Sequence, residues 1–189
     1  MPRRNQTGRI AMLIALGAMC FAMPAGSADR SLEHAVKASF LYKLASFVEW
    51  PAGSFESETS PFNLCVVGAD PFGGRIEEAV RGQSVGRHPI ALRYLKRAEP
   101  RSNCHAMFVS GSARQEVREA LDAVAGRPVL TVTDSVLGPA AGIVHFVIVD
   151  DRVGFDIDQV EAMRNRLVIS SKVLELARRV NRARPAGNR

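Results

Sequence analysis

The sequence contains few of the side chains that carry out chemistry. Its 189 residues include three cysteines, one tryptophan and four histidines, and the histidines, His34, His88, His105 and His145, are far apart in the chain. No CxxC or HExxH motif is present. A zinc site needs more soft ligands than this, and a hydrolase needs a nucleophile close to a base. The sequence therefore predicts no metal, no cofactor and no enzymatic activity.

There is also little net charge outside the first residues. The formal charge is +6, and three arginines among the first nine residues account for half of it. The remaining basic residues are scattered, except for a cluster near the end of the chain, Arg178, Arg179, Arg182 and Arg184. Such a distribution does not support nucleic-acid binding. The cluster is either a solvated helix end or a contact for a partner or a lipid surface.

Residues 1–28 have the three-part layout of a secretory signal peptide. Arginines precede an apolar run over residues 10–23, and small residues follow Pro24. About 14 apolar residues are fewer than the roughly 20 that a membrane-spanning helix needs. We expect export, cleavage before Asp29, one domain over residues 29–182, and a flexible basic tail over 183–189.

Two cysteines remain after removal of the leader, which carries Cys20. Cys65 and Cys104 are an even pair, and an exported location favours a disulfide over two free thiols. A metal site would need further ligands, and His105 is the one neighbour of a suitable type.

The first hydrophobic pattern of the mature chain predicts a long helix. Ser31 is its expected N-cap, and the Trp50-Pro51 step ends it. Glu33 and Lys37 are expected on the solvent side, four residues apart. The expected buried stripe recurs every three or four residues and comprises Leu32, Val36, Phe40, Leu44, Phe47 and Val48.

Further along the chain, apolar runs alternate with helical patterns. Strands are expected at residues 62–67, 90–94, 106–109, 129–132, 143–149 and 153–157, and helices at 74–81, 112–124, 159–164 and from Ser170 or Ser171 to Val180. A hairpin turn is expected at 150–152. The fold class is therefore α/β, a single-domain Rossmann-like sandwich with a mostly parallel central sheet, helices on both faces and a late antiparallel hairpin.

Two places have both a structural and a functional interpretation. The glycine-bearing loop 68–74 follows the first strand, where a doubly wound sheet presents phosphates to a helix, but its spacing is not GxGxxG and Asp70 would repel phosphate. A turn with a helix cap is the simpler interpretation. His145 alternates with Val144 and Phe146 in a strand and is either a satisfied structural histidine or a catalytic one.

Six stretches in order resemble one family, the YfiR-like periplasmic repressors. They are AVKASFLYKLASFVEWP (35–51), LCVVG (64–68), CHAMFVS (104–110), VLTVTD (129–134), VGFDID (153–158) and LVISSKVLELA (167–177), with a glycine-bearing turn before Ile143. The resemblance covers nearly the whole mature chain.

The resemblance implies a non-enzymatic periplasmic regulator. Such a protein binds the periplasmic sensor region of a membrane diguanylate cyclase, represses cyclic di-GMP synthesis and biofilm formation, and is itself sequestered by an outer-membrane lipoprotein. A disulfide matching Cys65 and Cys104 belongs to the family pattern. We also expect a homodimer, formed through an exposed strand edge or patch.

The candidate partner-binding residues are Trp50, Pro51, Phe155 and Arg178. Trp50 either is an exposed anchor, since tryptophan is enriched at interface hot spots, or packs in the core. A periplasmic small-molecule or nucleotide receptor is the alternative function, and a hydrolase is the third.

Overall fold

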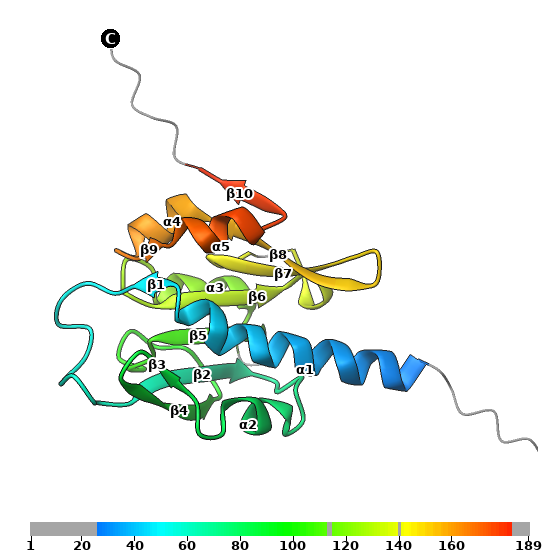
Figure 1. Cartoon of the computed structure of the whole chain (residues 1–189), viewed down its shortest axis with the longest axis horizontal. Coiled ribbons are helices and arrows are strands. Elements are labelled where there is room, and N and C mark those ends of the chain that lie inside the picture. The colour runs from blue at the N-terminus through cyan, green and yellow to red at the C-terminus, as the bar shows by residue number, and fades with distance from the viewer. Residues whose placement is uncertain (1–25, 113–114, 140, 183–189) are drawn as a thin grey trace, which may run out of the picture.

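The fold is a mixed α/β architecture built on one large, curled sheet (Figure 1). The computed structural model describes residues 26–112, 115–139 and 141–182. The helices are α1 (Gly26–Ala45), α2 (Arg75–Val80), α3 (Val117–Ala123), α4 (Gln159–Arg164) and α5 (Ser171–Leu176), with a 3-10 turn, η1 (Ser135–Leu137). The strands are β1 (Val48–Glu49), β2 (Phe62–Gly68), β3 (Ser84–Val85), β4 (His88–Leu95), β5 (Ala106–Gly111), β6 (Leu130–Asp134), β7 (Val144–Val149), β8 (Arg152–Asp158), β9 (Val168–Ile169) and β10 (Arg179–Asn181).

The main sheet is mostly parallel, as the sequence predicts. Its eight strands lie in the order β10-β8-β7-β6-β5-β2-β4-β3, and β4, β2, β5, β6 and β7 are parallel neighbours. The predicted late hairpin is confirmed, because β7 and β8 pair antiparallel around a turn in which Asp150 and Asp151 both have positive φ. A separate two-stranded sheet joins β1 to β9.

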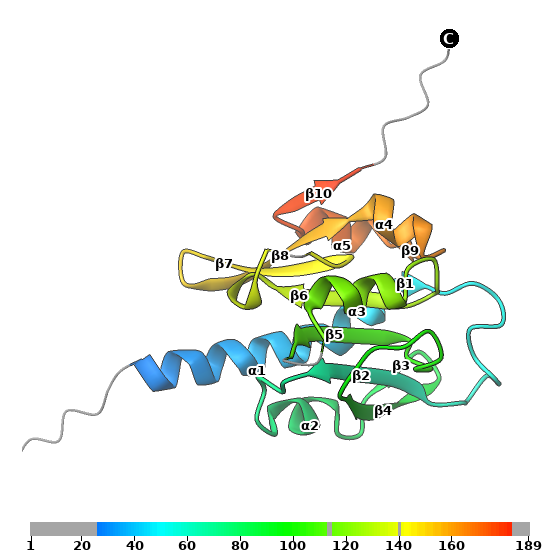
Figure 2. The same cartoon turned by 180° about the vertical axis from the view of Figure 1, so that it is seen from behind.

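Helices cover both faces of the sheet. α1 crosses in front of the strands in Figure 1, whereas in the reverse view of Figure 2 it lies behind them and α3 is in front. The larger core cluster lies between α1 and the sheet and is built around fully buried residues such as Leu41, Phe62, Phe108 and Phe146. A smaller cluster contains both cysteines and the buried face of α3.

The predicted first helix exists, but its ends and its buried face differ from the prediction. α1 ends at Ala45, before the Trp50-Pro51 step, and Ser31 lies inside it and accepts a hydrogen bond from Arg75 at 2.7 Å. Leu32 is 67% exposed and Phe47 41% exposed. The residues that α1 buries fully are Lys37, Ala38, Leu41, Leu44 and Ala45. This stripe also has spacings of three and four, but it contains a lysine, and the prediction placed that lysine in solvent.

Two further boundaries differ from the prediction. α3 begins at Val117, because Ser112 pairs with Gln115 in a bridge and does not cap the helix. α5 ends at Leu176, and Arg179–Asn181 forms the edge strand β10 beside β8, so the helix does not continue to Val180. The predicted cap at Asp158 is confirmed, since its carboxylate accepts the Glu161 N–H at 2.8 Å.

Most of the predicted signal peptide and the whole predicted tail lie outside the described residues. α1 begins at Gly26, three residues before the predicted cleavage point at Asp29. The domain boundaries at 1–28, 29–182 and 183–189 remain predictions.

Candidate functional site

The most unusual feature of the interior is a charged lysine. Lys37 of α1 is 1% exposed, and its Nζ lies 2.5 Å from Oδ2 of Asp134, the last residue of β6. The same Nζ donates to Glu33, one turn earlier on α1. A buried ammonium is tolerated only when it is paired, and here one cation faces two carboxylates.

Asp134 connects this ion pair to a surface element. All five residues of β6 are buried, so the strand delivers the Asp134 carboxylate beneath α1 at the carboxyl end of the sheet. Its other oxygen, Oδ1, accepts the N–H of Val136 at 3.1 Å and caps η1. The Lys37–Asp134 pair therefore fixes α1 and η1 relative to each other.

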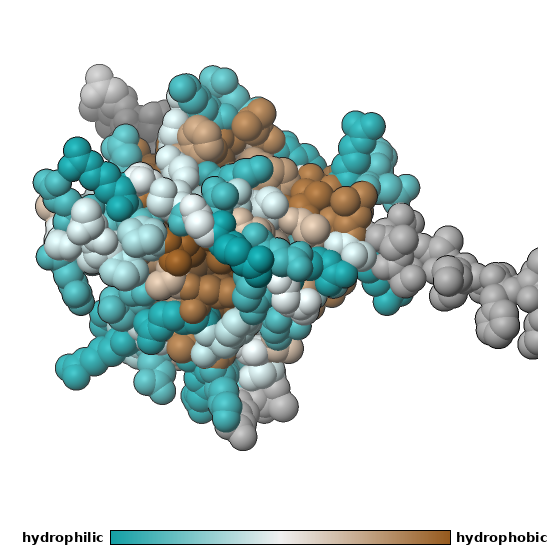
Figure 3. Space-filling view, turned by 60° about the horizontal axis from the view of Figure 1, so that its bottom comes forward, coloured by the Kyte–Doolittle hydropathy of each residue, from teal (hydrophilic) through white to brown (hydrophobic). Residues whose placement is uncertain are grey.

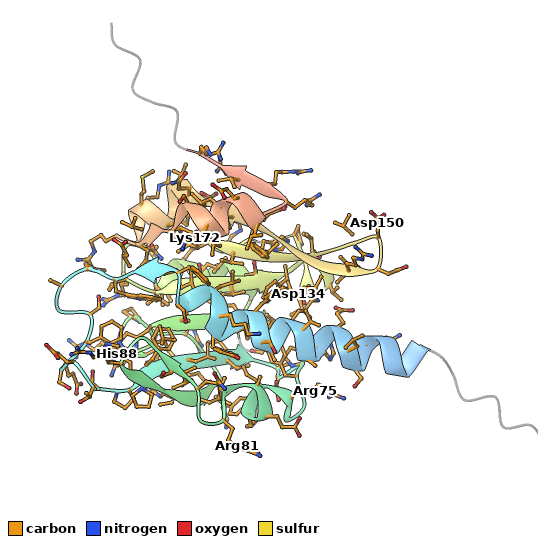
Figure 4. The ribbon with its side chains drawn as sticks, viewed as in Figure 1. Arg75, Arg81, His88, Asp134, Asp150 and Lys172 are labelled. Carbon is orange, nitrogen blue, oxygen red and sulfur yellow. A yellow bond between two sulfur atoms is a disulfide. The ribbon has the colours of Figure 1, made fainter. Side chains whose placement is uncertain are left out.

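An apolar groove opens beside this pair. We call it the α1–hairpin groove: it has a volume of about 630 Å³ and is lined by Leu32, Glu33, Val36, Ile148, Asp151, Arg152 and Val153. Figure 3 shows hydrophobic side chains gathered into a patch on the face that carries α1 and the β7–β8 hairpin. Figure 4 places Asp134 beside α1 and Asp150 at the tip of that hairpin.

Two exposed apolar side chains, Leu32 and Ile148, line the groove. Leu32, Ile148 and Val149 are exposed beside it, and Val136 and Leu137 are exposed on η1, which the ion pair holds. An exposed apolar recess with charged residues in its lining, here Glu33, Asp151 and Arg152, is a candidate binding surface. The sequence prediction missed this site, although both Lys37 and Asp134 lie in the stretches that carry the family resemblance.

The predicted anchor, Trp50, is partly buried. Its indole stacks edge-on against Phe55 and Phe62, with ring centroids 6.2 and 5.4 Å away, and its Nε1–H donates to the carbonyl of Pro128 at 3.2 Å. Pro51 beside it is also partly buried. In this conformation Trp50 closes one end of the core, and a partner-binding role for it remains a prediction.

The other two candidate residues lie together on β8 and just before β10. Phe155 is 5% exposed and packs against Phe40, so its side chain belongs to the core. Arg178 is exposed and forms two hydrogen bonds with Asp156, at 2.8 and 2.6 Å. Neither residue lines the α1–hairpin groove, and their contact with a partner remains a prediction.

Cys65 and Cys104 form a disulfide, as the sequence predicts. Cys65 lies in β2 and Cys104 just before β5, with Cα atoms 5.9 Å apart. The bond therefore joins neighbouring parallel strands under the smaller core cluster. Within the described residues, no cluster of histidine, cysteine and carboxylate side chains is arranged to hold a metal ion.

The loop after β2 has the structural role that its sequence favours. Asp70 accepts the N–H groups of Phe72 and Gly73 at 2.8 and 3.2 Å. The Ala69 N–H donates to the carbonyl of Gly111, and a Cβ on Gly68 would lie 2.2 Å from that oxygen. The end of β2 and the loop after it are thus in direct contact with the last residue of β5, at the point where a doubly wound sheet would open a crevice for a ligand.

The sequence contains one Gly-x-Ser-x-Gly pattern, Gly82 to Gly86, which the sequence prediction overlooks. A nucleophile elbow requires a strand, a sharp turn and a helix around the serine. Here Ser84 lies in the edge strand β3, which pairs antiparallel with β4. Val85 is opposite His88, so Ser84 and His88 project from opposite faces of the sheet. The serine of this pattern is therefore not brought close to His88 as a base.

His145 has the contacts of a structural histidine. Its Nδ1 lies 2.8 Å from the hydroxyl of Thr133, which also accepts the N–H of Gly142. Burial lowers the pKa of His145. A recess of about 360 Å³ between this histidine and β10 is also lined by Asp156 and Asp158. Under the alternative receptor function, this recess is the candidate ligand site.

The protein has a mixed α/β fold with an apolar groove between α1 and the β7–β8 hairpin. A profile of the YfiR/HmsC-like family matches residues 34–178, which is more than half of the chain. The chain belongs to the YfiR/HmsC-like family. No curated protein matches it significantly. Among the described residues, no helix is long and apolar enough to cross a membrane.

Proposed function

We propose that this protein is a periplasmic regulator that represses a membrane diguanylate cyclase by binding its periplasmic sensor region through the α1–hairpin groove. Membership of the YfiR/HmsC-like family suggests this class of regulator. In this proposal residues 1–28 direct export and are removed, and residues 29–182 act as a single Rossmann-like binding domain that lowers cyclic di-GMP and biofilm formation.

The observation that carries the proposal is the apolar groove between α1 and the β7–β8 hairpin. Exposed apolar side chains cost solvation free energy unless a partner covers them, and here the exposed Leu32 and Ile148 line one recess with the half-buried Val36 and Val153. Glu33, in the lining of that recess, is paired with Lys37, which in turn joins α1 to Asp134 of β6. A surface fixed before binding loses little conformational entropy when the partner docks.

Two further partners belong to the proposal. The family resemblance supports an outer-membrane lipoprotein that sequesters the regulator, and a homodimer is expected from the exposed apolar surface. The groove cannot serve two partners at once. Competition for it offers a simple way for the lipoprotein to relieve repression.

Two exposed leucines in helices provide a matched test of the groove. Leu32 is 67% exposed and lines the groove, whereas Leu176 is 74% exposed on α5 and does not. Leu32→Asp is expected to abolish co-purification with the cyclase and to raise cyclic di-GMP to the level of a deletion strain. Leu176→Asp is expected to leave both unchanged, because Leu176 lies outside the groove. Both variants are expected to fold normally, because each aspartate replaces a side chain that is already in solvent.

The outcomes distinguish a failure of the regulator proposal from a failure of the groove as its contact surface. If the deletion strain shows no rise in cyclic di-GMP while the wild-type protein is expressed, the regulator proposal fails and the receptor alternative takes its place. If the deletion raises cyclic di-GMP but Leu32→Asp represses normally, the regulator stands and the groove is not its contact surface.

A further inference from the structure

The segment between β1 and β2, residues 51–61, is held against the body of the molecule by an aromatic stack. We call this segment the strap. Its Phe55 ring is sandwiched between two imidazoles: the His88 ring lies 3.8 Å away at 12° and the His105 ring 4.5 Å away at 19°, between centroids. His88 lies in β4 and His105 just before β5, so the strap bridges two strands of the sheet. Figure 4 shows His88 at the side of the molecule away from Asp134 and the hairpin.

Both ring nitrogens of His105 are bonded, and the bonds define its protonation. The N–H of Asn63 donates to Nδ1 at 2.9 Å, so this nitrogen must carry a lone pair. Nε2 lies 2.9 Å from the carbonyl oxygen of Ser54, which can only accept, so Nε2 must carry the hydrogen. The neutral imidazole with its hydrogen on Nε2 is therefore the one form of His105 that satisfies both bonds.

His88 differs in this respect. Its Nδ1 lies 2.7 Å from the carbonyl of Ser60 and therefore donates. A second proton on His88 would go to Nε2 and would leave this bond intact. Each histidine stacks on Phe55 and bonds a carbonyl of the strap, but a second proton breaks a bond only at His105.

We infer that protonation of His105 releases the strap, which makes residues 51–61 an acid-sensitive closure over the disulfide end of the molecule. The added proton has to go to Nδ1, where the Asn63 N–H already points, so two hydrogens face each other and that bond breaks. The imidazolium is also 6% exposed and flanked by the Phe55 and Phe62 rings, so its charge lacks water. Moving the strap away readmits water to the charged ring.

The electrostatic surroundings of His105 lower its pKa on balance and so favour the neutral form. Burial lowers the pKa of His105, the Ser54 carbonyl opposes that shift, His88 adds to it and Glu56 of the strap opposes it. Glu99 and Arg127 are the other charged residues near His105, and they line a recess to which His105 also contributes. Because the closed form has the lower pKa, its advantage is complete above the ordinary histidine pKa of about 6.5 and is lost as the pH falls below that value. The ratio of open to closed strap then rises by up to about tenfold per pH unit.

Opening the strap changes what the molecule exposes. The strap residues Gly53 and Ser54 form one wall of a recess of about 170 Å³ that also contains Cys104. Phe55 covers the indole of Trp50 and the fully buried ring of Phe62. Acid would therefore widen access to the disulfide and uncover the single tryptophan of the chain.

That tryptophan makes the test direct. Acrylamide quenching and the emission maximum of Trp50 are measured on the purified protein between pH 7.5 and 4.5, with far-UV circular dichroism as a check on folding. The wild-type protein is expected to show a one-proton transition below pH 6.5, towards stronger quenching and red-shifted emission, with unchanged circular dichroism. A folded protein without this transition overturns the inference.

Two asparagine variants form a matched pair. His105→Asn keeps an acceptor where Nδ1 accepts from Asn63 but cannot be protonated, so its transition is expected to disappear. His88→Asn keeps a donor towards Ser60, and its transition is expected to remain. A transition that persists in His105→Asn, or that disappears only in His88→Asn, assigns the effect to another group and rejects the inference.

A measurement on the wild-type protein covers the case in which a variant does not fold. Nuclear magnetic resonance of the imidazole nitrogens is expected to show the Nε2–H form of His105 at pH 7.5. Amide exchange of residues 54–60 is expected to accelerate over the same pH range in which His105 titrates. Titration of His105 without faster exchange of the strap contradicts the inference.

Discussion

The groove end and the strap end of this molecule each depend on one buried polar side chain, but they use it differently. Lys37 is charged and is held by two carboxylates, whereas His105 is neutral and is held by two backbone groups. Removing a partner disrupts the first arrangement, and adding a proton disrupts the second. A charge pair therefore suits a surface that must keep its shape, and a neutral histidine suits a segment that must move.

The largest effect is expected at the groove end. Replacing Lys37 with methionine keeps most of the side-chain volume but leaves the Asp134 carboxylate buried without its cation. The free energy of unfolding is expected to fall by about 3–5 kcal/mol. Urea denaturation measures it. Lys43→Met, at an exposed lysine of the same helix, is the control and is expected to change stability by less than about 0.5 kcal/mol. Equal effects of the two substitutions would show that the ion pair contributes nothing special.

At the strap end, the disulfide is expected to contribute most. Cys104→Ser opens a covalent link between residues 39 positions apart and is expected to lower stability by about 2–5 kcal/mol. Denaturation of the wild-type protein with and without reductant provides the matching control, because the serine variant should no longer respond to reductant. Two free thiols in the unreduced, unfolded wild-type protein would contradict the bond itself.

A smaller effect is expected from the indole of Trp50. Trp50→Phe keeps an aromatic ring against Phe55 and Phe62 but removes the N–H that binds the Pro128 carbonyl. Loss of one such hydrogen bond is expected to lower stability by about 0.5–1.5 kcal/mol. Repression measured on the same variant separates the two roles of Trp50: lost repression at nearly normal stability would indicate a partner contact.

The smallest effect is expected at the second carboxylate. Glu33 is more exposed than Asp134, with 24% of its side chain accessible against 7%. Glu33→Gln leaves Lys37 paired with Asp134, and stability is expected to change by less than about 1 kcal/mol. Thermal unfolding beside Lys37→Met provides the comparison. A loss as large as that of Lys37→Met would show that Asp134 alone cannot hold the lysine.

The fold could be predicted from the sequence where the pattern is local. The apolar strands β2, β4, β5, β6, β7 and β8 and the Asp158 cap depend on adjacent residues, and the prediction found them. β10 was missed because Arg179–Asn181 has no apolar pattern and is a strand only through its pairing with β8. The two-residue strands β1, β3 and β9 likewise exist only through pairing, β1 with β9 and β3 with β4, and no periodicity marks them.

The candidate site was harder to predict than the fold. Lys37 and Asp134 are 97 residues apart, and the helical pattern allowed two stripes that differ in whether they include the lysine. The general preference of lysine for solvent favoured the wrong stripe. Asp134 ends a strand that the structure shows to be wholly buried, and no local pattern in the sequence says which distant residue pairs with its carboxylate.

The Lys37–Asp134 pair also constrains how related sequences can change. Loss of either residue alone leaves a buried charge without its partner, whereas replacing both with apolar residues of similar volume removes that penalty. A related sequence that changes these two positions one at a time therefore has a weakly folded intermediate. Across the YfiR/HmsC-like family, positions equivalent to 37 and 134 are expected to covary, retained together or replaced together.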